Sequence, residues 1–218
     1  AIARESQENG WWEKFRVEMG PRQALYADLE AGAEHIAEYH ITLLPGLLQI
    51  PTYTEVCAVA IVLPTPEDSR WSEHWKPELP GNGSLQTRRT TDEVIIDELA
   101  IRCHAAPPEV VRAQLDHLIN VGHEKRKITI RVLRLTSRIA GNAVPRSSYF
   151  SYRYPDPSDP VVVAVDTITS DLVHTDPDEV ANYASLLYER LRSAALSPAD
   201  SLDFLASVAE ELPDYTRR

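Results

Sequence analysis

A group of acidic and basic residues follows an apolar run in the middle of the chain. Asp97 and Glu98 come directly after Val94–Ile96, and Arg102 and His104 follow within six residues. A carboxylate at the end of a buried strand, close to a histidine, suits general acid–base chemistry on a small metabolite. The same residues suit a helix cap and an ion pair with the downstream arginine. The pattern favours this structural role, and an enzyme working through Asp97, Glu98, Arg102 and His104 remains the alternative.

Two pairs of tryptophans are a second candidate for chemistry. Trp11 and Trp12 lie near the beginning of the chain, and Trp71 and Trp75 lie one helical turn apart among prolines. Aromatic walls bind flat or apolar molecules, so either pair could line a ligand site. The plainer interpretation is that Trp11 and Trp12 pack a helix onto the body. Trp71 and Trp75 suit a lid or a surface that contacts a partner.

The sequence contains none of the standard catalytic or metal-binding motifs. It has no glycine-rich phosphate loop, no Gly-x-Ser-x-Gly and no His-Glu-x-x-His. His35 and His40 flank Tyr39, and their spacing does not place both on one face of a helix. We therefore expect no metal and no cofactor.

The charge and cysteine content narrow the class of protein further. The net charge is −11, which disfavours direct contact with nucleic acid. Residues 102–138 form a basic strip with eight Lys/Arg against three acids; it either offsets acidic helices or docks an anionic partner, and DNA binding by its 125–138 part is the least favoured interpretation. Cys57 and Cys103 are expected to be free thiols. With no signal segment and no long apolar run, we expect a cytoplasmic protein without a membrane segment.

The pattern of apolar residues predicts the elements that must position these side chains. Helices are expected over 4–19, 22–39, 51–63, 108–121 and 176–195 and again from 197, and strands over 93–98, 128–135, 148–154, 161–168 and 172–175. This order predicts an α+β fold in which a mixed or mostly antiparallel sheet of about four to five strands is flanked by N-terminal and C-terminal helices. One domain is expected over 11–212, divided into a helical part (11–63), a variable loop region (64–90), a sheet (91–175) and C-terminal helices (176–212); 1–10 is interpreted as a linker remnant and 213–218 as a tail.

Several short motifs occur in a recognisable order along the chain. The most specific is Leu44-Pro45-Gly46-Leu47-Leu48-Gln49, which is followed by Pro51-Thr52-Tyr53. The others are Trp11-Trp12, Tyr26, Leu29-Glu30-Ala31, Tyr39, Ile96-Asp97-Glu98, Gln114-Leu115, His117-Leu118, Tyr183, Leu187, Leu191, Ala195-Leu196-Ser197 and Asp200-Ser201. Over residues 10 to 208 this series resembles the domain of unknown function that follows an XRE-type helix-turn-helix in many actinobacterial, antitoxin-like transcription regulators.

The resemblance implies a regulatory role. In such proteins the helix-turn-helix reads DNA, and this domain receives either a small-molecule effector or a small protein encoded by a neighbouring gene. No helix-turn-helix is seen in this chain, so DNA contact is expected only through one that is absent here, and a homodimer is compatible with the sequence. The family's arginine-rich helix before the Asp-Glu strand is replaced by Trp, Pro and Gly over 69–89, so its contacts are not carried over.

The residues expected to bind the effector or partner combine these motifs. They are Trp11, Trp12, Tyr39, Gln49, Tyr53, Trp71, Trp75, Asp97, Glu98 and Arg102. Within the Pro-Gly-Leu-Leu-Gln element, Pro45 and Gly46 force a turn and the leucines anchor it. Gln49 could bond a neighbouring backbone group or a ligand, and the scaffold role is favoured.

Overall fold

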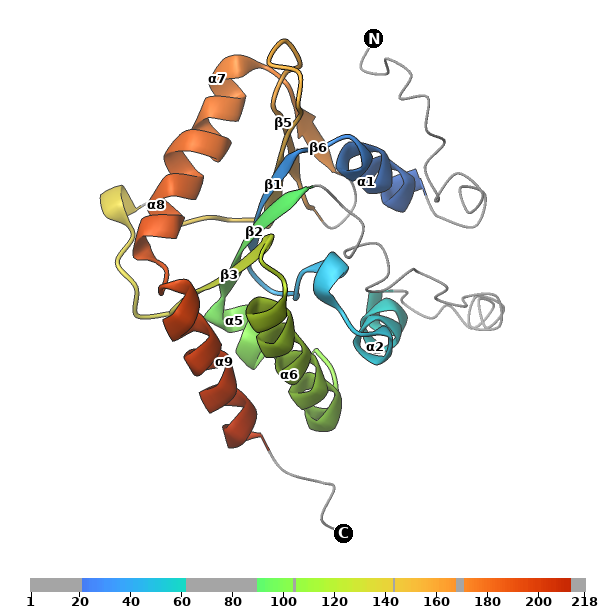
Figure 1. Cartoon of the computed structure of the whole chain (residues 1–218), viewed down its shortest axis with the longest axis vertical. Helices are drawn as coiled ribbons and strands as arrows, with labels where there is room; N and C mark the ends of the chain where they lie inside the picture. The colour runs from blue at the N-terminus through green and yellow to red at the C-terminus, as the bar shows by residue number, and fades with distance from the viewer. Residues whose placement is uncertain (1–20, 62–89, 104, 143, 168–170, 213–218) are drawn as a thin grey trace.

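The computed structural model describes residues 21–61, 90–103, 105–142, 144–167 and 171–212. The expected helix 4–19, the expected loop 64–90 except its last residue, the four tryptophans and His104 lie outside these residues. The described part is an α+β fold built on one six-stranded mixed sheet, with helices on both faces (Figure 1). The expected fold class is confirmed, and the sheet has more strands than the four to five predicted.

The sheet has the strand order β3-β2-β1-β4-β5-β6. Its strands are β1 (His35–His40), β2 (Thr91–Asp97), β3 (Ile128–Leu133), β4 (Tyr149–Arg153), β5 (Val162–Val165) and β6 (Leu172–His174). β1, β2 and β3 are parallel to one another, whereas β4, β5 and β6 join by antiparallel pairing. The strands β2 to β6 are the five that the alternating and β-branched runs predicted.

The sixth strand, β1, corrects the sequence analysis. Residues 22–39 were expected to form one helix, but α1 (Pro21–Ala31) ends directly before Gly32 and residues 35–40 form β1. β1 lies between β2 and β4, where both of its edges are hydrogen-bonded. This pairing outweighs the helical spacing of the apolar residues, as tertiary context often outweighs local propensity.

Two layers of helix cover the sheet. One face carries α2 (Pro51–Ile61), α6 (Pro108–Glu124) and α9 (Pro198–Glu211), which share a core with the side chains of β2 and β3. The other face carries a long helix made of α7 (Pro177–Val180), a π-helical segment η4 (Ala181–Leu187) and α8 (Tyr188–Ala194). α1 covers β4 and β5 on the α2 side. The expected helices over 108–121, 176–195 and from 197 are thus confirmed, and so is the expected helix 51–63 as far as Ile61, where the described residues end.

Two shorter helical segments complete the described chain. The five-residue helix α5 (Glu98–Arg102) follows β2 without a loop, because Asp97 caps its first turn. A 3₁₀ turn, η2 (Gly46–Leu48), lies between β1 and α2, and another, η3 (Ala140–Asn142), lies between β3 and β4.

Candidate functional site

The carboxyl end of β2 carries the acidic residues that the sequence analysis selected. Asp97 accepts a hydrogen bond from the backbone N–H of Leu99 at 2.9 Å through Oδ1. Its other oxygen accepts the hydroxyl of Tyr39 at 2.9 Å. Burial, and then the negative charge of Asp97, raise the pKa of Tyr39 above its ordinary range. The structure therefore brings two candidate residues together, and Asp97 bonds both the start of α5 and the neighbouring strand.

Glu98 and Arg102 lie in α5, directly after the carboxyl end of β2. The Glu98 side chain is buried, and it accepts the Arg102 Nε at 2.8 Å and the backbone N–H of Leu135 at 3.0 Å. Arg102 also donates to Glu211 at 2.6 Å, and its guanidinium lies 5.7 Å from the centre of the Phe204 ring. These contacts join α5 to the end of β3 and to α9. Asp97, Glu98 and Arg102 are thus each engaged in a bond between elements, and His104 lies outside the described residues.

The Pro45–Gln49 motif lies between β1 and α2, and its backbone is held by side-chain amides. Gln49 donates to the carbonyl of Leu44 at 2.8 Å and accepts the Thr54 hydroxyl at 3.0 Å. From α6, the wholly buried Gln114 donates to the carbonyl of Leu48 at 2.8 Å and accepts the N–H of Ile50 at 2.7 Å. Both amides bond main-chain groups, which is the arrangement expected of a scaffold.

Tyr53 follows the motif in the first turns of α2. Its side chain is buried in the core shared with α6, and burial raises its pKa above the ordinary tyrosine value. This core lies on the opposite face of the sheet from the Tyr39–Asp97 contact, because Tyr39 belongs to the cluster under α8. The structure therefore divides the described candidates between two faces.

A buried polar pair on β1 escaped the sequence analysis. Glu38 Oε2 and His40 Nε2 lie 2.7 Å apart, and the two residues are only 3% and 5% exposed. The ring edge of Phe150 meets the His40 ring at 5.2 Å between centroids. Burial lowers the pKa of His40 to about 4, and the charge of Asp166 opposes this shift. The helical interpretation of the segment concealed this pair, because residues two apart share a face in a strand but not in a helix.

Tyr152 lies on the same face of the sheet as Glu38 and His40, because it pairs with Ile36, two residues before Glu38. Tyr152 on β4 pairs with Ile36 on β1, and Phe150 pairs with Glu38. The Tyr152 hydroxyl is buried and has no hydrogen-bond partner among the described residues. Its pKa is raised well above the tyrosine range, by burial first and then by the charges of Glu30 and Glu38. Buried polar atoms without partners are rare in proteins and call for a specific explanation.

A row of aromatic rings crosses the opposite face. Tyr39 and Tyr149 have ring centroids 5.9 Å apart, Tyr149 and Tyr183 are 5.4 Å apart, and His174 stacks on Tyr183 at 5.6 Å. Tyr183 lies in the π-helical segment η4, and such segments often occur at functional sites. His174 Nδ1 is 2.7 Å from Glu179, so the row ends on a polar contact between β6 and α7.

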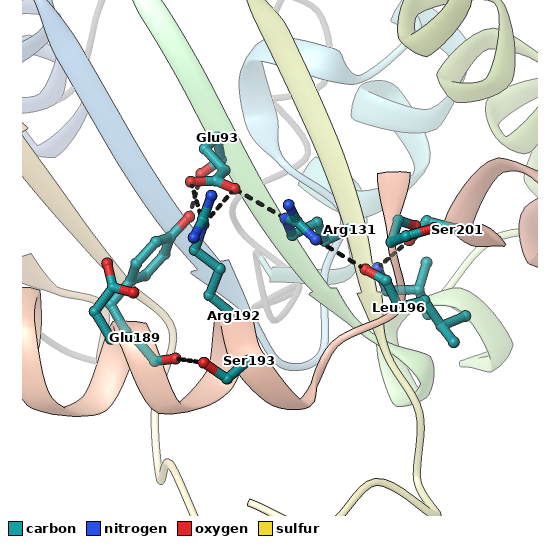
Figure 2. A network of polar contacts seen from close by, with 10 residues as sticks. Glu93, Arg131, Glu189, Arg192, Ser193, Leu196 and Ser201 are labelled. Atoms are coloured by element: carbon teal, nitrogen blue, oxygen red, sulfur yellow. Dashed lines mark hydrogen bonds and ion pairs between the residues drawn. The ribbon is translucent and has the colours of Figure 1, made fainter. Parts of the chain in front are cut away.

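Further along the same face, a network of ion pairs connects β2, β3 and α8 (Figure 2). Glu93 accepts hydrogen bonds from Arg131 and Arg192, each at 2.9 Å, and Arg131 also donates to the carbonyl of Leu196 at 3.2 Å. Burial would raise the pKa of Glu93, but the two arginines outweigh it and the net shift is downward. The Tyr188 hydroxyl donates to the Glu93 carbonyl at 2.8 Å. This network holds α8 on the sheet and uses part of the basic strip structurally.

In the described ranges, His, Cys, Asp and Glu side chains nowhere gather in groups of three or more that could hold a metal ion. His35 and His40 belong to one strand, and their odd separation places them on opposite faces of the sheet. None of the helices in the described ranges combines the length and the apolar character that crossing a bilayer requires.

The fold and the polar contacts define an α+β domain with a mixed sheet. Two of its polar centres lie on opposite faces of this sheet: the Tyr39–Asp97 contact and the Glu38–His40 pair. Residues 23–207 match the family described as "Domain of unknown function (DUF5753)", and the chain belongs to this family. The match covers the region from α1 into α9, including both polar centres. The search of curated proteins gave no match to the chain.

Proposed function

We propose that this chain is the signal- or partner-receiving domain of a transcription regulator, in which a separate XRE-type helix-turn-helix reads DNA. Two kinds of evidence support the proposal. The motifs between Trp11 and Ser201 resemble those of the actinobacterial regulators, and the chain belongs to a family whose match covers residues 23–207. A regulator of this type acts in the cytoplasm and receives either a small-molecule effector or a small protein encoded beside it.

The observation that carries the proposal is the buried Glu38–His40 pair beside the Tyr152 hydroxyl. A buried charged or polar pair is costly, and apolar residues of similar volume are often neutral or more stabilising. Natural domains depart from apolar packing mainly where function requires it. Here the polar atoms lie on the two central strands β1 and β4, between the core under α1 and the core under α2. On this face the Tyr152 hydroxyl has no hydrogen-bond partner among the described residues, so it is the atom that a small effector would bond.

The contacts at the end of β2 favour a binding role over the enzymatic alternative. Asp97 caps α5 and accepts the Tyr39 hydroxyl, and Glu98 and Arg102 join α5 to β3 and α9. A general acid or base must exchange protons with a substrate, which requires breaking these bonds. These bonds are better suited to transmitting a shift of the strands, caused by a bound effector or partner, to the helices α5 and α9.

A thermal-shift screen of small metabolites on the intact chain tests the effector arm. A specific ligand should raise the melting temperature of the wild type, and His40→Gln should abolish the shift. The exposed His123 of α6 offers a matched control, because His123→Gln makes the same chemical change away from the sheet. The partner arm is tested by a pull-down with the small protein encoded next door. Failure of both arms, together with metabolite turnover that Asp97→Asn abolishes, would replace the proposal by the enzymatic alternative.

A further inference from the structure

The two edge strands of the sheet, β3 and β6, differ in how the rest of the chain covers them. At the β3 edge, the N–H of Val132 donates to the Ser201 hydroxyl at 2.9 Å, and the carbonyl of Val132 accepts the N–H of Leu196 at 2.9 Å. The connection between α8 and α9 thus passes along this edge and bonds its backbone. A sheet edge that is bonded in this way is not available for another strand.

The other edge, β6, presents apolar side chains. β6 is the last strand in the order and is antiparallel to β5. Leu172 is 50% exposed and Val173 is 43% exposed. Successive residues of a strand point to opposite faces, so the edge is apolar on both sides. In Figure 1 β6 lies beside α1, at the opposite end of the sheet from β3, which the chain between α8 and α9 covers. An exposed apolar edge strand is a ready template for an added strand.

The acidic residues near β6 favour a partner segment that carries positive charge. From Asp171 to Glu179, the stretch that contains β6 and the start of α7, the chain carries four carboxylates and no Lys or Arg. The acids are Asp171, Asp176, Asp178 and Glu179. Asp171 directly precedes β6, and Glu179 contacts His174 at the end of β6. A negative rim attracts a basic segment and repels a second copy of the same edge.

We propose that the β6 edge docks a partner protein through an extended segment that alternates apolar and basic residues, which pairs with β6 as a seventh strand. The inference rests on the proposed function, because it names the surface and the chemistry of the partner. The backbone of β6 supplies main-chain hydrogen bonds, Leu172 and Val173 supply apolar contacts on the two faces, and the acidic rim supplies charge complementarity.

The test uses the full 218-residue chain and a synthetic ten-residue peptide of alternating lysine and valine with blocked ends. Binding is measured by fluorescence anisotropy at physiological salt. A second peptide keeps every lysine but replaces the two central valines by proline, which cannot pair within a strand. A third peptide replaces each lysine by glutamate. We expect the first peptide to bind at least tenfold more tightly than either of the others.

Substitutions in the protein locate the site. Val173→Lys should weaken binding of the first peptide at least tenfold, and Val144→Lys should change it less than twofold. Val144 is an exposed valine in the connection between β3 and β4, so it receives the same change of charge away from β6. Thermal unfolding of both variants checks that they fold. The proline peptide tests strand pairing on the wild-type chain, so that comparison does not depend on any variant folding.

Several results would overturn the inference. Equal affinity for the proline peptide would show charge attraction without strand pairing, and equal effects of the two valine variants would move the site away from β6. Dimerisation of the chain in sedimentation velocity, abolished by Val173→Lys, would assign the edge to a second copy. If the neighbour-encoded protein binds but ignores Val173→Lys, this inference fails while the proposed function stands. If that protein does not bind but the first peptide does, the β6 edge still pairs with a basic extended strand, and the proposed function then depends on its effector arm.

Discussion

The scaffold role of the Pro45–Gln49 motif can be tested on one side chain, Gln114. Its amide bonds the carbonyl of Leu48 at 2.8 Å and the N–H of Ile50 at 2.7 Å, and the residue is wholly buried. Gln114→Ala leaves one buried donor and one buried acceptor without a partner. Each orphaned group costs roughly 1–3 kcal/mol. We therefore expect the free energy of unfolding to fall by roughly 2–6 kcal/mol, with the lower end applying if water enters the vacated space.

Equilibrium unfolding in urea, followed by the far-ultraviolet circular dichroism of the helices, measures this loss. Asn120→Ala is the matched control, because Asn120 is an exposed amide on the same helix. Its effect should stay within about 0.5 kcal/mol, since alanine is the better helix former and no buried bond is lost. A loss at Gln114 as small as that at Asn120 would refute the view that these amides hold the motif in place.

Three further predictions concern bonds that join elements. The pKa of Glu93 is lowered in the folded protein, so its carboxylate stabilises the fold at neutral pH, and this stabilisation is lost as the pH falls through the folded pKa. Glu93→Gln should lower the free energy of unfolding in urea by roughly 1–3 kcal/mol at pH 7. The difference between the variant and the wild type should shrink in acid and should not grow. Ser201→Ala should cost roughly 1–3 kcal/mol in thermal unfolding, because it orphans the N–H of Val132, whereas the exposed Ser207→Ala should cost less than about 0.5 kcal/mol; equal losses would contradict the closed edge. Asp97→Asn keeps an oxygen for the cap and should be milder than Asp97→Ala, which should cost about 1 kcal/mol or more by chemical denaturation.

The sequence predicts most of the elements because their local signals agree with their tertiary environment. The helix beginning at Pro177 has a capping Asp176, a first-turn proline and early acids, and the structure confirms this start. The alternation in residues 128–133 predicts β3 correctly, because one side chain in two faces the α6 core. Where one face of a segment is buried and the other is more exposed, the periodicity of its apolar residues is sufficient to predict the type of element.

β1 shows where sequence reasoning fails. The apolar residues from Leu25 onward continue at helical spacing past Ala31, and no alternation is visible because both faces of β1 are buried. Only the pairing with β2 and β4, which are distant in sequence, decides the strand. Misreading the segment also concealed the Glu38–His40 pair, since residues two apart share a face in a strand but not in a helix.

The candidate site was predicted in part. The sequence identified Asp97 as either a cap or a catalytic group, and the structure gives it a cap contact and a bond to Tyr39. The binding roles of Tyr39, Gln49, Tyr53, Asp97, Glu98 and Arg102 remain predictions. The openness of β6 could not be predicted, because exposure of Leu172 and Val173 depends on which strands lie beside them.

A calorimetric titration of the intact chain with the small protein encoded beside its gene tests the central claim most directly. We predict saturable binding that Val173→Lys weakens at least tenfold and that Val144→Lys leaves unchanged within twofold. A tenfold loss corresponds to about 1.4 kcal/mol of binding free energy. Absence of any binding, together with metabolite turnover that Asp97→Asn abolishes, would contradict a receiving domain and establish an enzyme.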